Sequence, residues 1–284
     1  MRLRRDGHPL QLDKSALASA LPDAGGKLLV LAHGLCMNDL QWARQGHDHG
    51  TALARDLGYT PAYLHYNSGR HISTNGREFA DQLEILVANW PVAVKELAIL
   101  GHSMGGLLAR SAWHYGTAAG HAWPRRLKKL VFLGTPHHGA PMERGGNLID
   151  IALGVSPYTA PLSRLGKIRS SGITDLRHTW LLDEDWRGRD RFARSSGHHA
   201  AVPLPDGVKC FAIAATTGKQ AGDIKDRLVG DGLVPLASAL GCHAEHDRNL
   251  MFPPDRQWIA LETGHLDLLC RKQVYERIRG WLAA

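Results

Sequence analysis

Short runs of apolar residues alternate along this chain with segments whose apolar residues recur at helical spacing. The first run, 27–32, is apolar at nearly every position and ends at His33-Gly34. Continuous apolar runs of this length are typical of strands buried on both faces of a parallel sheet. Further strands are expected at the runs 61–65, 97–100, 130–133, 211–215 and 258–261.

Helical periodicity fills the stretches between these runs. The clearest case is 75–90, where Phe79, Leu83 and Leu86 fall on one face and Pro91 ends the pattern. Other helices are expected around 41–57, after Ser103 and from about His265. The alternation of strand and helix predicts an α/β protein with a doubly wound, mostly parallel sheet and helices on both faces.

The motif Gly101-His102-Ser103-Met104-Gly105 directly follows the run 97–100. Such a motif places the serine on a sharp turn between a strand and a helix, so that its hydroxyl is exposed. Glycines on either side permit the close contacts and strained dihedral angles of the turn. The positive end of the following helix favours the negative charge that develops during acyl transfer. We therefore predict that Ser103 is a nucleophile.

A serine hydroxyl needs an imidazole base near neutral pH, and the imidazole needs a carboxylate that orients it. On this kind of sheet the expected chain order is serine, acid, histidine. His265, at the end of the last expected strand, is the predicted base. Asp231, flanked by two glycines, is the predicted acid, and Asp223 and Asp226 are the alternatives. Asp267 is discounted because it lies too close to His265 along the chain.

The negatively charged oxygen of the tetrahedral intermediate needs preorganised N–H donors. One expected donor is the backbone N–H of Met104, the residue after the nucleophile. The second is the backbone N–H of Leu35, in the loop after the first strand. The two side chains should matter mainly through their shape.

The alternation of strands and helices stops between about Pro141 and Pro205. A structureless loop of that length is uncommon in a compact domain, so an inserted substructure is expected. It contains an apolar stretch at 148–153 and a charged run at 183–187. We interpret 141–205 as a cap over the site, with the core formed by 1–140 and 206–284; a surface decoration is the alternative.

Composition and charge narrow the class of partner. The chain has 284 residues, 44% of them hydrophobic, and a net charge of +7. Its densest basic cluster, 125–129, has no interleaved aromatic residues, so we interpret it as a solvated connection and expect no nucleic-acid partner. A general attraction to anionic surfaces is compatible with the charge. The sequence leaves the oligomeric state open.

The cysteines and the N-terminus indicate a cytoplasmic protein. The four cysteines lack C-x-x-C spacing and are interpreted as thiols, although a bridge between Cys242 and Cys270 stays open. The basic N-terminus has no apolar segment after it, and no run has membrane-spanning length. The histidine groups 47–49, 137–138 and 243/246 form no recognised set of metal ligands, so no metal is expected.

Taken together, five motifs resemble those of the α/β-hydrolase superfamily, in its lipase and esterase branch. They are His33-Gly34-Leu35, Gly101-His102-Ser103-Met104-Gly105, Gly134-Thr135-Pro136-His137-His138-Gly139, Gly230-Asp231-Gly232-Leu233-Val234-Pro235 and Gly264-His265. The third motif is similar to one in bacterial lipases and in GPI-inositol-deacylase-like hydrolases. The resemblance implies a carboxylic-ester hydrolase that acts through an acyl-enzyme on a small-molecule or lipid ester, without a cofactor.

The chain departs from this family in two ways: the N-terminal segment shows no clear pair of opening antiparallel strands, and the secretion signal of many lipases is missing. The apolar stretch of the expected cap suggests medium to long acyl chains and a transient contact with a lipid surface. An acyltransferase, a thioesterase or an amidase would use the same three side chains. An inactive hydrolase fold that serves as a binding module is the alternative of another class.

Overall fold

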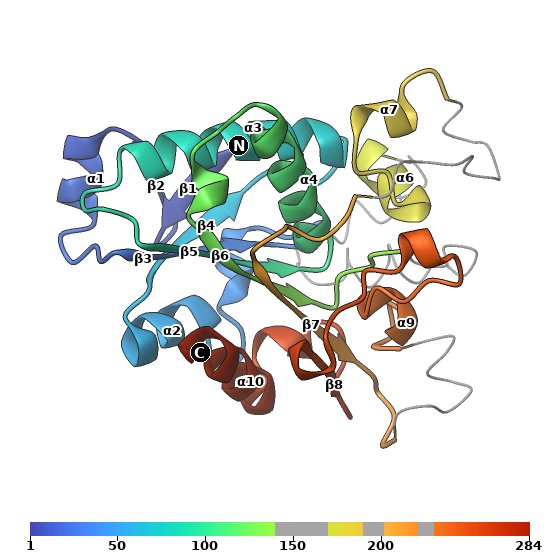
Figure 1. The fold of residues 1–284 in the computed structure, drawn as a ribbon. Coiled ribbons are helices and arrows are strands. Elements are labelled where there is room, and N and C mark those ends of the chain that lie inside the picture. The colour runs from blue at the N-terminus through green and yellow to red at the C-terminus, as the bar shows by residue number, and fades with distance from the viewer. Residues whose placement is uncertain (140–169, 190–201, 221–229) are drawn as a thin grey trace.

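One eight-stranded sheet forms the centre of the molecule in the part that the structure, a computed structural model, describes: residues 1–139, 170–189, 202–220 and 230–284 (Figure 1). The strand order is β2-β1-β4-β3-β5-β6-β7-β8. The strands are β1 (Arg2–Arg5), β2 (His8–Pro9), β3 (Lys27–Ala32), β4 (Thr60–His65), β5 (Glu96–His102), β6 (Leu127–Leu133), β7 (Lys209–Ala215) and β8 (Gln257–Ala260). All neighbours from β4 to β8 are parallel, and β1 is antiparallel to both β2 and β4.

Helices cover both faces of this sheet (Figure 1). The α-helices are α1 (Lys14–Ala20), α2 (His49–Leu57), α3 (Ile72–Ala88), α4 (Met104–Ala118), α6 (Ser171–His178), α7 (Asp183–Trp186), α9 (Leu236–Ala239) and α10 (Lys272–Ala283). The 3-10 helices are η1 (Asp39–Trp42), η2 (Trp123–Arg125), η5 (His246–Arg248), η6 (Pro254–Arg256) and η7 (Asp267–Leu269). Because α1, α3 and α4 lie on one face and α2 and α10 on the other, the prediction of a doubly wound, mostly parallel sheet is confirmed.

Strand β3 shows why the central runs are apolar throughout. Leu28 and Val30 point into the cluster that includes α3 and α4, whereas Leu29 and Leu31 point into the cluster with α2 and α10. Successive side chains of a strand alternate between its two faces, so a strand between two helical layers needs apolar residues at every position. Burying each of these side chains contributes about 1.5–3 kcal/mol.

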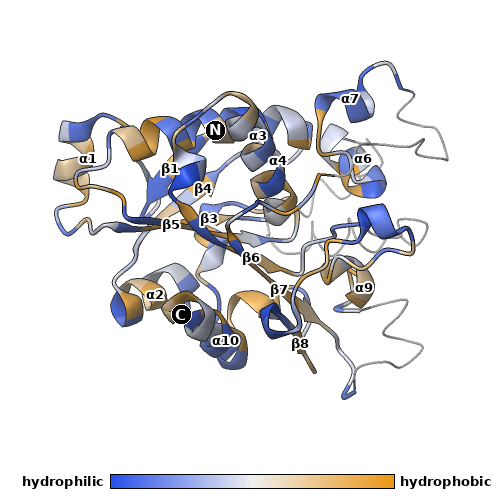
Figure 2. Ribbon diagram, viewed as in Figure 1, coloured by the Kyte–Doolittle hydropathy of each residue, from blue (hydrophilic) through white to orange (hydrophobic). Residues whose placement is uncertain are grey.

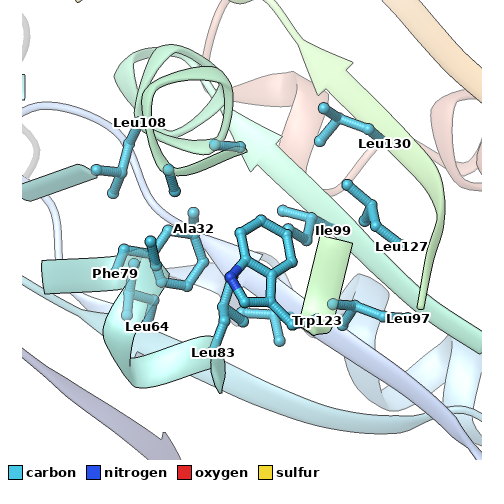
Figure 3. Close-up of a cluster of buried hydrophobic side chains, with 14 of the residues drawn as sticks. Ala32, Leu64, Phe79, Leu83, Leu97, Ile99, Leu108, Trp123, Leu127 and Leu130 are labelled. Atoms are coloured by element: carbon cyan, nitrogen blue, oxygen red, sulfur yellow. The ribbon is translucent and has the colours of Figure 1, made fainter. Parts of the chain in front are cut away.

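The layer between the sheet and α3 is the larger of the two clusters (Figure 3). This cluster contains Phe79 and Leu83 of α3, Ile99 of β5 and Trp123 of η2. Figure 2 shows hydrophobic and hydrophilic positions interspersed along α3 and α10, as expected for helices that turn one face to a sheet.

The N-terminal segment corrects one expectation. It does form an antiparallel pair, β1 and β2, and Leu3 of β1 lies opposite Leu64 of β4. Within β1 only Leu3 is buried. Four residues with a single buried side chain give no readable alternation, so the prediction that this pair is missing was wrong.

Two helix predictions were also wrong at their boundaries. The expected helix 41–57 is divided into η1 and α2 by a turn in which Gln45 and Gly46 have positive φ angles. Asp48 then caps α2 by accepting a hydrogen bond of 2.7 Å from the N–H of Thr51. The last helix begins at Lys272 rather than near His265, because the intervening residues form the 3-10 turn η7.

The basic cluster 125–129 is only partly a solvated connection. Lys129 lies within β6 and is 7% exposed. Its ammonium group donates to the carbonyl of Leu282 at 2.8 Å and lies 3.3 Å from the Glu96 carboxylate. The interpretation of Lys129 as solvated was therefore wrong, since this side chain ties β6 to β5 and to the C-terminal helix.

The described part of the expected cap lies against α3 and α4 (Figure 1). Asp175 of α6 accepts hydrogen bonds from His71 at 2.9 Å and from the N–H of Ile72 at 2.7 Å. Ser111 of α4 donates to the carbonyl of Leu181 at 2.7 Å. The apolar stretch 148–153 lies outside the described residues, so the division into core and cap stays a prediction.

Two further findings concern the cysteines and membranes. All four cysteines are free thiols, so Cys242 and Cys270 are not bridged. Within the described ranges, no helix has both the length and the apolar character that a membrane crossing requires.

Candidate active site

Ser103 occupies a strained turn between β5 and α4. Its φ is 54° and its ψ is −124°, in a region that residues with a Cβ rarely adopt. Its N–H donates to the carbonyl of Leu133, the last residue of β6, at 2.8 Å. Backbone strain of this kind costs on the order of 1–3 kcal/mol and persists where the surrounding structure enforces it. The turn directs the chain from a buried strand straight into a helix.

Close backbone contacts explain the glycines of this turn. A Cβ on Gly101 would lie 2.6 Å from the Cα of Gly106. A Cβ on Gly105 would overlap the carbonyl group of Ala32, at the end of β3. Only glycine allows α4 to begin this close to β3 and β5. The motif is therefore required by packing as well as by the turn itself.

The structure brings Asp231 and His265 together. Nδ1 of His265 donates to Oδ2 of Asp231 at 2.6 Å, and both side chains are buried. The other carboxylate oxygen accepts from the N–H groups of Leu233 at 3.0 Å and Val234 at 2.8 Å. The carboxylate therefore holds the proton of His265 on Nδ1 and leaves Nε2 as the basic nitrogen.

The end of β6 links this pair to the serine. Leu133 accepts the Ser103 N–H, and a Cβ on the next residue, Gly134, would lie 3.1 Å from both Oδ2 of Asp231 and Cε1 of His265. The ring of His102 lies 4.7 Å from that of His265. The three predicted residues thus lie at one edge of the sheet. In the part of the chain that the structure describes, the Ser103 hydroxyl makes no hydrogen bond.

The loop after β3 lies directly against the serine. A Cβ on Gly34 would be 3.1 Å from the Cβ of Ser103. The N–H groups of Leu35 and Met104 have no acceptor among the described residues. Unpaired N–H groups beside the half-buried Ser103 are available to a developing oxyanion.

Three residues that sequence reasoning did not single out hold this loop and His265 in place. Tyr66, directly after β4, donates its hydroxyl to the carbonyl of His33 at 2.8 Å. Ser68 accepts the N–H of Cys36 at 3.0 Å. His102 meets the backbone carbonyl of His265 through Nε2 at 3.1 Å. His102 stands in the serine motif, but only the folded chain shows which group it contacts.

Burial keeps the histidines behind the site neutral. Desolvation lowers the pKa of His33 from 6.5 to about 4. Desolvation, and secondarily the charge of His265, keeps the pKa of His102 well below its usual range. Because a carbonyl oxygen only accepts, Nε2 of His102 carries the proton and donates it to His265.

Asp223 and Asp226, the alternatives for the acid, lie outside the described residues. Asp267 accepts the N–H of Gly264 at 3.1 Å and lies 3.7 Å from Arg271, so it stabilises the turn that carries His265. Across the described ranges, no group of three His, Cys, Asp or Glu side chains comes together in a way that could hold a metal ion.

Comparison with known proteins assigns the fold. A family model described as a PGAP1-like alpha/beta domain matches residues 23–203. No curated protein matches the chain. The Bacillus licheniformis lipase BlEst2 in its mature form superimposes with a TM-score of 0.57 at 16% identity, over 90% of this chain and 91% of that one.

Two further structures agree in fold. Aspergillus fumigatus lipase B has a TM-score of 0.53 at 12% identity, over 94% of this chain and 57% of its own length. The NocB thioesterase domain, in covalent complex with a fluorophosphonate nocardicin G analog, has a TM-score of 0.53 at 16% identity, over 93% of this chain and 97% of its own. These similarities confirm the α/β-hydrolase fold that the motifs suggested.

Proposed function

The chain belongs to the PGAP1-like alpha/beta domain family, and we propose that it is a serine carboxylic-ester hydrolase that acts through an acyl-enzyme. The observation that carries the proposal is the buried hydrogen bond between His265 and Asp231, beside the strained turn of Ser103. An orienting carboxylate, a base and a nucleophile at the same edge of the sheet are the requirements of this chemistry.

In the proposed reaction, Oγ of Ser103 attacks the ester carbon while Nε2 of His265 accepts the hydroxyl proton. The Asp231 carboxylate stabilises the resulting imidazolium. The N–H groups of Leu35 and Met104 bind the oxyanion. When the tetrahedral intermediate collapses, the imidazolium protonates the leaving alcohol and the acyl group stays on Ser103. Water then attacks the acyl-enzyme with the same proton transfers and releases the acid.

We further propose a small-molecule or lipid ester with a medium to long acyl chain as the substrate. The support is the apolar sequence at 148–153, within the expected cap. A series of p-nitrophenyl esters of increasing chain length tests this proposal with the purified protein. Turnover of acetate with none on longer chains would exclude it.

The test of the mechanism is the Ser103→Ala variant. Loss of the nucleophile should lower kcat by about a millionfold, as for other serine hydrolases. Ser19→Ala, at an exposed position of α1, is the matched control and should keep full activity. A fluorophosphonate probe should label the wild type and Ser19→Ala but not Ser103→Ala. If Ser103→Ala kept most of its activity, or if the wild type resisted the probe, the proposal would be wrong.

Product analysis separates the related activities. With an ester substrate and an added alcohol, a hydrolase releases the free acid, whereas an acyltransferase forms the new ester. Amide and thioester analogues of the best ester test the leaving group. Faster turnover of the thioester or the amide would reassign the substrate class while leaving the roles of the three side chains unchanged.

A further inference from the structure

A cavity of about 120 Å³, lined by both polar and apolar residues, lies between α4, the loop after β6 and the turn around η5. The charged and polar residues that line it include Arg110, His137, His138, Asp247, Arg248 and Asn249. One water molecule takes up about 30 Å³ in the liquid, so the space is sufficient for a group as large as a carboxylate or a phosphate.

Arg110 is a buried cation that has no acidic partner among the described residues. It is 3% exposed, on the inner side of α4. Its guanidinium donates to the carbonyl of Val202 and, at 3.3 Å, to Nδ1 of His137. Its Nε has no acceptor, and within the described ranges no carboxylate pairs with it. Burial lowers the pKa of Arg110 only to about 10, so the group is charged at neutral pH.

The neighbouring His137 adds a further unused donor. Since a guanidinium only donates, Nδ1 of His137 accepts and its Nε2 carries the proton. Among the described residues this Nε2 is buried without a partner. Buried polar groups are normally hydrogen-bonded, and a buried charge normally has a counter-ion. A cavity that concentrates such unpaired donors is suited to an anion.

We propose that this cavity binds an oxyanion, a carboxylate or a phosphate group, through the guanidinium of Arg110. Guanidinium groups recognise both anions through paired N–H donors. Asp247 is exposed at the rim, where its charge weakens the binding without neutralising the buried cation. The proposal does not depend on the serine chemistry, because it concerns a separate set of residues.

Residues that line the cavity form hydrogen bonds with the helix that follows the turn of Asp231. The N–H of His138 donates to Oγ of Ser238 at 3.1 Å, and the N–H of His137 to its carbonyl at 3.2 Å. Ser238 belongs to α9, which begins directly after the turn that carries Asp231. The oxyanion is therefore either a charged group of the substrate or a free ion that acts on this loop.

Calorimetric titration of the full chain with inorganic phosphate and with acetate, at constant ionic strength, tests the proposal. We expect saturable binding of at least one of the two. Arg110→Gln should raise its Kd about tenfold or more, since it removes a charge-assisted contact. Arg126→Gln, at an exposed position, is the matched control and should leave Kd unchanged. Asp247→Asn should lower Kd about two- to fivefold by removing an opposing charge.

The absence of saturable binding of both ions would overturn the proposal, as would an Arg110→Gln variant that is folded and binds with unchanged Kd. If Arg110→Gln does not fold, Asp247→Asn decides: an unchanged or higher Kd refutes the site. Ester substrates with and without a carboxylate then identify the source. If Asp247→Asn changes KM for the ester with a carboxylate but not for the uncharged ester, the oxyanion is a group of the substrate. A change in the turnover of the neutral ester on adding phosphate assigns it to a free ion.

Discussion

Replacing Asp231 by asparagine should place the proton of the His265 ring on Nε2, so that Nε2 can no longer accept a proton, while the fold is preserved. The asparagine oxygen can keep the hydrogen bonds from Leu233 and Val234, at 3.0 and 2.8 Å. Its amide NH₂ then stands where Oδ2 accepted from Nδ1 of His265 at 2.6 Å. An NH₂ group only donates, so Nδ1 must accept and the imidazole proton moves to Nε2.

A protonated Nε2 cannot accept the proton of Ser103. Where the aspartate of such a triad becomes asparagine, kcat falls about 10⁴-fold. This loss corresponds to about 5.4 kcal/mol of transition-state stabilisation, at 1.36 kcal/mol for each factor of ten. The free energy of unfolding should change by no more than about 1–3 kcal/mol, since one charge-assisted hydrogen bond is weakened and the two backbone donors stay paired.

The assay is kcat on a p-nitrophenyl ester, with urea unfolding in parallel. Asp267→Asn is the matched control, because Asp267 lies in the loop that carries His265 and contacts Gly264 and Arg271 instead of the imidazole. Its kcat should stay within about tenfold of the wild type, as expected for a structural contact. A folded Asp231→Asn variant with near wild-type kcat would refute the assignment, and a large loss in Asp223→Asn or Asp226→Asn would then identify the acid.

The remaining predictions concern residues behind the site. Burial lowers the pKa of His49 from 6.5 to about 4, so between these pH values only the unfolded chain takes up the proton. Stability should therefore fall as the pH drops through this range, by about 3 kcal/mol for this side chain. When the free energy of unfolding is measured with urea between pH 7 and 4, it should fall less steeply with decreasing pH in His49→Gln than in the wild type. His8→Gln, at an exposed position, is the control and should fall as the wild type does. If His49→Gln and the wild type showed the same dependence on pH, the reasoning would be contradicted. Tyr66→Phe removes the hydrogen bond to the His33 carbonyl and should lower kcat up to about tenfold with KM unchanged. Tyr59→Phe, next to the opposite end of β4, is the control and should leave kcat unchanged. A change confined to KM in Tyr66→Phe would contradict a role in the oxyanion loop. His102→Phe removes the donor to the His265 carbonyl and should lower kcat about tenfold. His102→Gln keeps a donor near the Nε2 position and should have a kcat close to that of the wild type. Equal losses of kcat in both variants would indicate that His102 acts only through packing.

Sequence reasoning succeeded where the signal was contained in one short segment. The strand before Ser103, the turn and the helix after it all fall within about twenty residues, and the close contact that requires glycine at Gly101 is with Gly106, in the same segment. The apolar runs predicted the buried strands because a strand between two layers of helices buries both of its faces. His265 was predicted in the same way, from its place at the end of the last run.

The errors came from segments whose structure depends on distant partners. Strand β1 exists because Leu3 pairs with β4, sixty residues further along the chain, and no pattern within β1 reveals it. The burial of Lys129 depends on the C-terminal helix. Both cases involve a side chain whose surroundings are supplied by another part of the chain.

By itself, then, the sequence determined the class of fold, the turn at Ser103 and the candidates for acid and base, because these follow from periodicity and local backbone geometry. Only the tertiary structure decided that Asp231 accepts a hydrogen bond from His265, that His102 and Tyr66 contact the backbone around the site, and that Arg110 is buried with no counter-ion among the described residues. Contacts between distant segments depend on how the twisted strands bring their carboxyl ends to one edge. Spacing along the chain carries no record of that arrangement.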